Sequence, residues 1–261
     1  MEQKKRLYLL DTIRGMAILG MFLIHINYDL PTMLGIDPEY TYSFGYHVFG
    51  QLVRGTFIFL SGYCAFMGKK TLKRGLIVSA AGLVITASTV LAGIMTKGGF
   101  IPIYFGVLTL IGASMLLSVP FRKIVNKKNA PVFFFACLLC FFLTIHMYAG
   151  YAGIYGHPLF YYPDFLYKAK NPVLAMVTAF IGFPNATFQS SDYFPLMPWF
   201  FLFMSGFSLY GWIGEKINSL KIMKIRIEPV TFLGRYSLWV YLIHQPVFLG
   251  ILWIISLFIK N

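Results

Sequence analysis

The sequence predicts an all-α fold, a polytopic transmembrane helix bundle of about seven full spans plus one short re-entrant or interfacial helix. Of the 261 residues, 58% are hydrophobic and only 12% are charged. The apolar runs are long enough to cross a bilayer, which takes about 20 helical residues, rather than to fill a soluble core. They also lack the alternation of β-barrel strands, so helices are expected to satisfy the backbone in lipid.

The predicted spans follow one another along the chain. They lie near Leu7–Asn27, His47–Met67, Leu76–Met95, Ile101–Val119, Pro131–Tyr148, Phe194–Ile213 and Tyr236–Ile259. A further apolar stretch, Pro172–Gly182, is too short to be assumed to cross. No long linker and no internal repeat divides the sequence, so residues 1–261 are predicted to form a single integral-membrane domain.

The formal net charge of +13 is concentrated in alternate connections between the predicted spans. The basic residues there are Lys4, Lys5 and Arg6, then Lys69, Lys70, Lys73 and Arg74, then Arg122, Lys123, Lys127 and Lys128, and finally Lys216, Lys221, Lys224 and Arg226. By the positive-inside rule this pattern predicts a cytoplasmic N-terminus, and a topological role for the charge rather than nucleic-acid binding. If Pro172–Gly182 crossed fully, the last basic connection would lie outside, which favours a re-entrant or interfacial helix.

The first predicted span carries ionisable residues that a simple membrane anchor would avoid. Arg14 and His25 are separated by an eleven-residue step, which turns an α-helix through about 1100° and rises about 16 Å, so they share a face at different depths. Asp11 lies one turn before Arg14, and Asp29 lies one turn after His25. Because ionisable groups at membrane depth are costly and tend to face a protein interior or a wet cavity, this stripe predicts a functional site.

Polar residues recur in two other predicted spans. The second span places Gln51, Arg54 and Ser61 on one helical face, and its Gly55 and Gly62 are typical of close helix packing. The last span carries Arg235, Tyr241, His244 and Gln245 before Pro246, which is expected to bend the helix. For each residue alone a structural role is an equal alternative, but three spans with polar residues favour a site.

Several other features of the sequence admit an ordinary explanation. The connections Tyr28–Tyr46 and Ala149–Asn171 are rich in Tyr, Pro and Gly, which suits either an interfacial aromatic belt or stacking against sugar rings. The three cysteines all lie within spans, where membrane packing is the simpler explanation. The five histidines show no compact ligand motif, so no metal is predicted.

Five blocks of the sequence carry a family resemblance. The first is "LLDTIRGMAILGMFLIHINYDL", and "GQLVRGTFIFLSGY", "YFGVLTLIGASMLL", "SSDYFPLMPWFFLFMSGF" and "LGRYSLWVYLIHQPV" follow in order. Together they resemble the catalytic-domain family of heparan-alpha-glucosaminide N-acetyltransferase and its short bacterial relatives, within the transmembrane acyltransferase superfamily. The resemblance implies a multi-pass protein of a bacterial-type plasma membrane. Acetyl-CoA would approach from the cytoplasm, and the acetyl group would go to an amine or hydroxyl of an extracytoplasmic sugar or glycan.

His25 is the first candidate for catalysis in such a transfer. Imidazole can take a proton from an amine or hydroxyl near neutral pH, and as an alternative it could attack the thioester and carry the acyl group itself. Arg14, tied to Asp11, would position the helix or the acyl donor, since a guanidinium does not deprotonate. The animal lysosomal enzyme has asparagine where this chain has His25, and its proposed catalytic histidine lies just before the second span. His47 is therefore the second catalytic candidate.

Further residues are candidates for binding the acceptor or the acyl donor. Asp192 and Tyr193 lie at the mouth of the predicted span Phe194–Ile213, where capping of that helix by Ser191 or Asp192 is the simpler alternative. Arg235, Tyr241, His244 and Gln245 form the second candidate group. Two other classes of function stay open, a small-molecule transporter and a non-catalytic membrane assembly subunit, although a visible repeat, common in transporters, is missing. Glycine-rich faces also permit a homo-oligomer.

Overall fold

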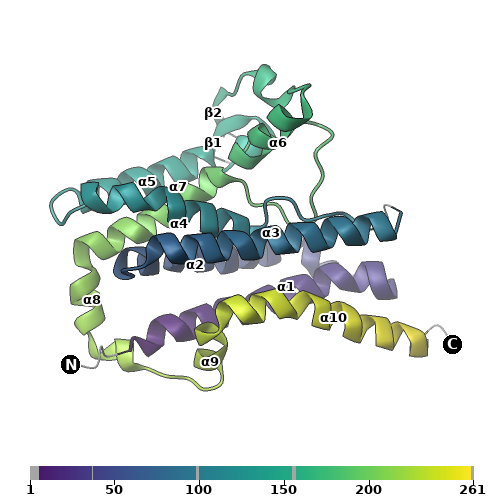
Figure 1. Cartoon of the computed structure of the whole chain (residues 1–261), viewed down its shortest axis with the longest axis horizontal. Coiled ribbons are helices and arrows are strands. Elements are labelled where there is room, and N and C mark those ends of the chain that lie inside the picture. Colours follow the sequence, from purple (N-terminus) through teal and green to yellow (C-terminus); the bar gives the residue numbers. More distant parts are fainter. Residues whose placement is uncertain (1–5, 37, 98–99, 155–156, 260–261) are drawn as a thin grey trace. The chain divides into compact units, whose positions relative to one another are not determined.

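The computed structural model describes residues 6–36, 38–97, 100–154 and 157–259, and almost all of its regular structure is helical (Figure 1). The all-α prediction is confirmed. The chain divides into two compact units, one formed by Met1–Phe57 with Glu215–Asn261 and the other by Ile58–Gly214. The single-domain organisation stays a prediction. Lys4 and Lys5 lie outside the described residues.

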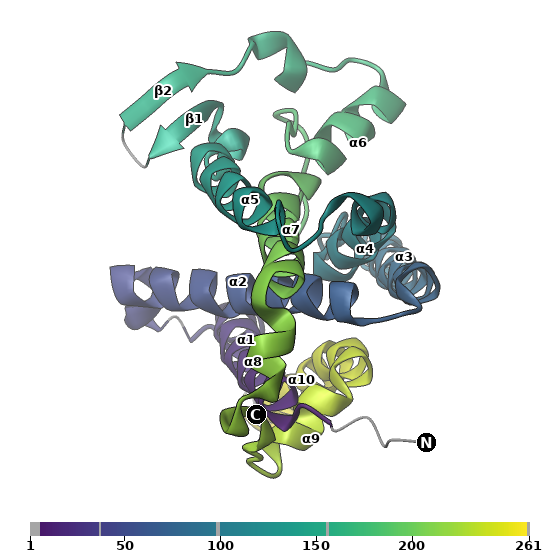
Figure 2. The same cartoon turned by 90° about the vertical axis from the view of Figure 1, so that its left-hand side faces the viewer.

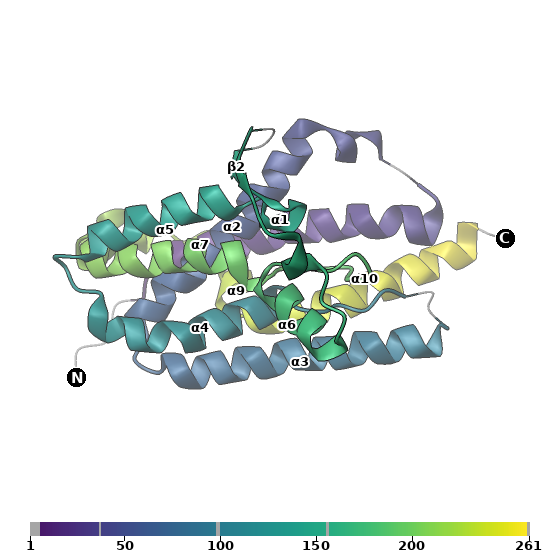
Figure 3. The same cartoon turned by 90° about the horizontal axis from the view of Figure 1, so that it is seen from above.

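The first unit is built around two long helices, α1 and α10. Its elements are α1 (Tyr8–Leu34), η1 (Glu39–Tyr42), the first part of α2 (Phe44–Met67), α8 (Glu215–Ser219), η5 (Lys221–Lys224), α9 (Val230–Arg235) and α10 (Ser237–Ile259). Helices α9 and α10 both pack against α1, and α10 runs alongside α1 (Figures 1 and 3). Two segments from opposite ends of the sequence therefore form one helical layer.

Helix α1 is longer than the predicted span, which ended at Asn27. It continues through Pro31 to Leu34 and is capped by Gly35, whose φ of 68° is left-handed and whose N–H donates to the Pro31 carbonyl. Glycine adopts this conformation without the steric cost that other residues meet, so it makes an effective helix stop. The extra turns keep Asp29 inside the helix, on the same side as His25.

A glycine crossing holds α1 against α9. A Cβ atom added to Gly15 would overlap the Val230 carbonyl, and one added to Gly234 would overlap the Asp11 carbonyl. The two backbones meet this closely because neither glycine has a side chain, the arrangement that small residues permit between membrane helices. The crossing fixes the N-terminal half of α1, including Asp11.

The second unit contains two helix pairs and an irregular cap. Its elements are the remainder of α2, α3 (Thr71–Met95), α4 (Val107–Ile124), α5 (Ala130–Thr144), η2 (Met147–Ala149), β1 (Tyr151–Ile154), β2 (His157–Tyr161), η3 (Asp164–Tyr167), α6 (Pro172–Ile181), α7 (Leu196–Leu209) and the π-helical turn η4 (Tyr210–Gly214). Helix α3 packs on α4, and α5 packs on α7 (Figure 2). Gly62 of α2 packs against the Phe203 backbone, which confirms its predicted packing role.

Within the described residues, five helical stretches are long and apolar enough to cross a membrane. They are Tyr8–Pro31, Thr71–Met95, Val107–Ile124, Ala130–Ala149 and Leu196–Ser219. The other two predicted spans, His47–Met67 and Tyr236–Ile259, also form helices, but α2 carries the polar Gln51 and Arg54. A multi-pass membrane protein is confirmed, and the count of seven full spans stays a prediction.

The predicted span Ile101–Val119 is wrong at its start. Helix α4 begins six residues later, at Val107, and runs on to Ile124. The preceding segment is drawn away from helical geometry because it hydrogen-bonds to a distant one: Ser191 N–H donates to the Pro102 carbonyl at 3.2 Å, and Phe194 N–H donates to the Phe105 carbonyl at 2.9 Å. Apolar composition alone could not reveal these partners.

The connection after α5 contains a two-stranded antiparallel hairpin that the sequence analysis did not predict. Strands β1 and β2 pair Tyr151 with Tyr161, and the register shifts between Ala152 and Gly153. Helix α6, predicted as a short re-entrant or interfacial helix, has 10 residues and is capped by the Asn171 side chain. Ten residues rise about 15 Å, about half the hydrocarbon thickness, so α6 alone cannot cross a bilayer.

Candidate active site

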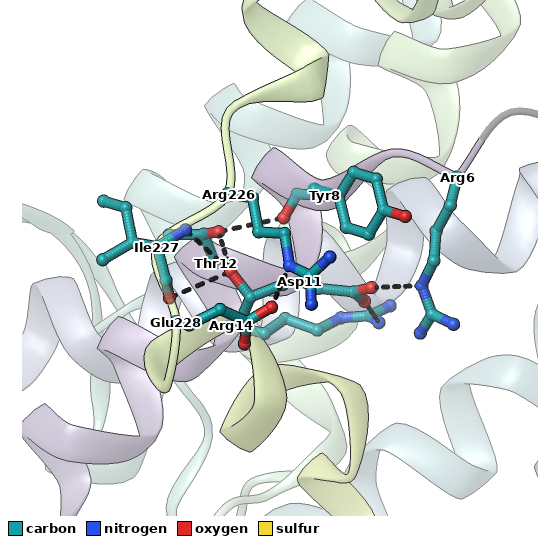
Figure 4. A network of polar contacts seen from close by, with 9 residues as sticks. Arg6, Tyr8, Asp11, Thr12, Arg14, Arg226, Ile227 and Glu228 are labelled. Carbon is teal, nitrogen blue, oxygen red and sulfur yellow. Dashed lines mark hydrogen bonds and ion pairs between the residues drawn. The ribbon is translucent and has the colours of Figure 1, made fainter.

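A charged network occupies the N-terminal end of α1 (Figure 4). Arg6 Nε donates to Asp11 Oδ2 at 3.0 Å, and Arg14 Nη1 lies 3.6 Å from Asp11 Oδ1. The predicted pairing of Arg14 with Asp11 is therefore present, and a second guanidinium joins it. Two cations around one carboxylate neutralise the charge of Asp11, which favours a structural role for this end of the helix.

Threonine hydroxyls tie the same end of α1 to α9. The Thr12 and Thr231 hydroxyls share a hydrogen bond of 2.8 Å, and both side chains are buried. Thr231 also accepts from the Ile227 N–H at 3.0 Å. Close by, the Arg226 guanidinium lies 5.3 Å from the centre of the Tyr8 ring and pairs with Glu228 (Figure 4). The sequence analysis missed Thr12 and Thr231, since hydroxyls in apolar runs give no spacing signal.

Two histidines meet at the other end of this helix pair. His25 of α1 and His244 of α10 have ring centres 5.0 Å apart, tilted by 53°. His244 is only 6% exposed. These residues are 219 positions apart in the sequence, and the packing of α10 on α1 brings them together.

The surroundings of His244 fix its orientation. Its ring stacks on Phe22 at 5.5 Å and meets Phe248 edge-on at 5.8 Å. Its Nδ1 lies 2.6 Å from the Tyr241 carbonyl oxygen. Because a carbonyl oxygen only accepts, Nδ1 carries the proton, and in the neutral ring the lone pair is on Nε2. The predicted candidate Tyr241 thus acts on His244 through its backbone.

A carboxylate and an amide lie beside the two histidines. Gln245 Nε2 donates to Asp29 Oδ2 at 2.9 Å, and Asp29 is 5% exposed. The Oε1 atom of Gln245 is buried, and it has no hydrogen-bond partner among the described residues. Asp29 follows His25 by four residues, and Gln245 follows His244 directly. The four predicted candidates His25, Asp29, His244 and Gln245 therefore form one cluster.

The first part of α2 brings Arg54 toward this cluster. Gly20 of α1 faces α2 closely, since a Cβ added to it would lie 2.6 Å from Val53 Cγ2. Arg54 follows Val53 directly and is half-buried. Two other predicted residues of α2, His47 and Gln51, are exposed. Arg235, at the end of α9, is also exposed and lies over the Tyr236 ring at 5.5 Å.

Three predicted candidates belong to the second unit. Ser61 lies in the remainder of α2. The Tyr193 hydroxyl donates to the Ala179 carbonyl at 2.6 Å, and burial raises the pKa of this phenol above its usual range. Asp192 does not cap the helix of the predicted span Phe194–Ile213, because Pro195 is the N-cap of α7 and no side chain caps it. The Asp192 carboxylate instead lies beside Gly106, at the start of α4.

The charge of Asp192 suits that position, because a helix N-terminus attracts anions.

Of the predicted acceptor or donor candidates, the structure brings Tyr241, His244 and Gln245 together around His25. It gives Tyr193 a hydrogen bond within its own unit. Phe22, which stacks on His244, was missed by the sequence analysis because an aromatic residue in an apolar run carries no distinguishing pattern.

Comparison with known proteins gives one match. The sequence model of the family described as heparan-alpha-glucosaminide N-acetyltransferase, catalytic, matches residues 6–246. That range includes both the Asp11 network and the His25–His244 pair. No curated protein and no solved structure matches the chain. Because the match covers nearly the whole sequence, the chain belongs to the heparan-alpha-glucosaminide N-acetyltransferase catalytic family and is a membrane acetyltransferase.

Proposed function

We propose that this protein transfers an acetyl group from cytosolic acetyl-CoA to an amine or hydroxyl of an extracytoplasmic sugar or glycan. The observation that supports this most is the contact between His25 and His244, whose ring centres are 5.0 Å apart between α1 and α10. Asp29, one turn after His25, and Gln245, next to His244, offer oxygen atoms that can accept hydrogen bonds from a sugar amine or hydroxyl.

In this proposal His25 is the general base. It takes the proton of the acceptor while the acceptor nitrogen or oxygen attacks the thioester carbonyl carbon that acetyl-CoA supplies. As the new C–N or C–O bond forms, the C–S bond breaks, and His25 returns the proton to the departing thiolate. Imidazole suits both transfers because its ordinary pKa is about 6.5.

His244 is the second base candidate or the group that orients His25. The hydrogen bond from its Nδ1 to the Tyr241 carbonyl directs its basic Nε2 away from that carbonyl. The buried stack on Phe22 holds the ring in place. A fixed ring loses little entropy when the reacting groups assemble, which is how positioned catalytic groups lower a barrier.

The charge pattern supports the proposed direction of transfer. Basic residues at the N-terminus and in alternate connections favour a cytoplasmic start of α1. His25 then lies about 16 Å deeper than Arg14, toward the outer surface, where a polar acceptor can arrive without crossing lipid. We accordingly propose a bacterial-type plasma membrane with a cytoplasmic N-terminus.

A transfer assay with purified protein in nanodiscs tests the proposed function. Labelled acetyl-CoA is supplied with glucosamine, a chitosan oligosaccharide or a hydroxyl-bearing polysaccharide fragment, and both acetylated product and free thiol are measured. The wild type is expected to release thiol in step with product. His25→Ala should lower the rate about 10²- to 10⁴-fold, the usual range for loss of a general base.

His47→Ala is the matched variant, because it removes the second catalytic candidate. We expect it to keep most of the activity, and loss of activity in His47→Ala with activity kept in His25→Ala would exchange the two roles. Acetyl-CoA binding, measured by calorimetry, is expected to survive both substitutions. Folded wild type that neither binds acetyl-CoA nor transfers acetyl would refute the proposal, and sugar uptake without transfer would favour a transporter.

A further inference from the structure

The segment that contains α5 and the hairpin has no formally charged residue. Between Lys128 and Asp164 the sequence has no Asp, Glu, Lys or Arg. This run covers all of α5, η2 and both strands of the hairpin. Exposed hairpins in water normally carry charges along their edges, because unpaired strand edges otherwise promote aggregation. The composition of a membrane helix thus continues through the hairpin.

The second strand presents apolar side chains on both of its faces. All five residues of β2 are exposed, including Leu159 at 70%, Phe160 at 55% and Tyr161 at 72%. Successive side chains of a strand point to opposite faces, so Leu159 and Tyr161 share one face and Phe160 lies on the other. The Phe160 ring meets Tyr162 edge-on at 5.2 Å and the Tyr161 ring meets Tyr151 at 6.4 Å, yet more than half of the surface of each side chain stays exposed.

The base of the hairpin is nevertheless held firmly. The His146 and Tyr151 rings stack at 5.1 Å, and the Tyr162 ring meets Phe183 edge-on at 5.5 Å. The Tyr167 hydroxyl donates to the Met147 carbonyl at 2.5 Å. Burial, together with the nearby Tyr162, raises the pKa of Tyr167 to about 12, so this hydroxyl stays protonated and keeps donating.

Helix α5 has an exposed apolar stripe that leads to the hairpin. Val132, Phe135, Leu139 and Phe142 are all at least 58% exposed, and their spacing of three and four residues puts them on one helical face. Tyr148, just past the end of the helix, is 62% exposed. In a membrane helix such a stripe faces lipid. Figure 2 shows β1 and β2 next to the end of α5.

We propose that the β1–β2 hairpin is an interfacial anchor that inserts Leu159, Phe160 and Tyr161 into the headgroup region of the bilayer beside α5. Tyrosine is enriched at this depth, because its ring is apolar and its hydroxyl is hydrated. Water in the headgroup region can also satisfy the unpaired edges of the two strands, which hydrocarbon could not. A sugar-binding platform is less well supported, since such sites combine aromatic rings with placed polar groups.

Site-directed spin labelling in nanodiscs of phosphatidylcholine and phosphatidylglycerol tests the anchor. Nitroxides are attached to Leu159→Cys, Phe160→Cys and Tyr161→Cys in a background where Cys64, Cys137 and Cys140 are replaced by alanine. Collision rates with oxygen and with a water-soluble nickel chelate report depth. Leu139→Cys is the lipid reference, and Lys128→Cys, an exposed residue of a basic connection, is the aqueous reference.

The oxygen-to-nickel collision ratio at the three hairpin positions should be several-fold higher than at Lys128 and below that at Leu139. A ratio equal to that at Lys128 would overturn the anchor. If a chitosan oligosaccharide then immobilised the aqueous labels, the hairpin would instead be a sugar platform. Wild-type protein gives a second test, in which a diazirine-bearing phosphatidylcholine should photolabel the β2 peptide. Labelling of α5 without β2 would contradict the proposal.

Discussion

At the N-terminal end of α1 the Asp11 carboxylate lies between two guanidiniums, whereas near the C-terminal end the Asp29 carboxylate accepts a hydrogen bond from the Gln245 amide. Both carboxylates are buried, and both lie one turn from another polar residue of the same helix. The first is neutralised by charge, and the second is bound by a neutral group next to two imidazoles. One helix thus carries a structural anchor at one end and groups suited to chemistry at the other.

The packing also differs between the two ends of α1. At the anchor end, Gly15 and Gly234 let the backbones of α1 and α9 touch, and nothing larger than hydrogen fits. At the other end, rings of Phe22, His244 and Phe248 fill the space between α1 and α10. Where the backbones touch, an added side chain would push the two helices apart. Where side chains fill the space, one side chain can be replaced by a smaller one without moving the helices. Substitutions at the two ends should therefore affect different properties.

The largest effect is expected at His244. Replacing it by alanine removes a buried imidazole from the histidine cluster, and we expect kcat/KM for acetyl transfer to fall about 10²-fold, which corresponds to about 2.7 kcal/mol of activation free energy. Acetyl-CoA binding by calorimetry should change little. An unchanged rate in a folded His244→Ala protein would show that this histidine is only part of the packing.

The next effect is expected at the glycine crossing. Gly234→Leu forces α1 and α9 apart, and overpacking of this kind costs about 1–3 kcal/mol or more. The measurement is the thermal unfolding midpoint in detergent. Gly250→Ala of α10 is the matched control, because an added Cβ there meets no atom within 4 Å. Gly250→Ala should not lower the midpoint. If both variants lowered it equally, the glycine crossing would be no more sensitive to an added side chain than an open position of α10.

An intermediate effect is expected when only the charge of Asp29 is removed. Asp29→Asn keeps the size of the side chain and an oxygen that can accept from Gln245. We expect kcat/KM for the sugar acceptor to fall about tenfold, which equals about 1.4 kcal/mol. The KM for acetyl-CoA should stay the same. If both substrates were affected equally, Asp29 would be assigned to the stability of the cluster instead.

The smallest effect is expected at Arg6. Its side chain is 40% exposed, and Arg14 remains beside Asp11 when Arg6 is replaced by glutamine. Because water screens the Arg6 side of this ion pair, we expect it to contribute no more than a surface pair does, about 0–1 kcal/mol, so the unfolding midpoint should fall slightly at low salt. The difference should vanish near 1 M salt, where charges are screened within about 3 Å. A large loss of transfer in Arg6→Gln would contradict the structural role of this end.

The polar face of α1 is the feature that sequence reasoning handled best. An α-helix repeats every 3.6 residues, so the positions of Asp11, Arg14, His25 and Asp29 on one helix follow from spacing alone. The same holds for Tyr241, His244 and Gln245 of α10. Periodicity within one helix does not say which other helix it meets, and so the pairing of His25 with His244 could not be predicted.

The errors lie where long-range contacts outweigh local preference. The residues before α4 are apolar enough for a helix, but their backbone bonds to the segment before α7, over 80 residues away in the sequence. The hairpin after α5 lacks the two-residue turn signals that strand prediction needs, and its residues 155–156 lie outside the described ones. Neither case carries a local pattern.

By itself the sequence determined the class of fold, because the length and apolar character of its runs leave helices as the satisfied backbone structure in lipid. Spacing along each helix also determined which polar residues share a face. The tertiary structure alone decided that α9 and α10 fold back onto α1. It also decided that glycines lie where α1 meets α9 and that histidines lie where α1 meets α10. The physical reason is that close packing depends on shape and on partners hundreds of residues apart, which no local pattern encodes.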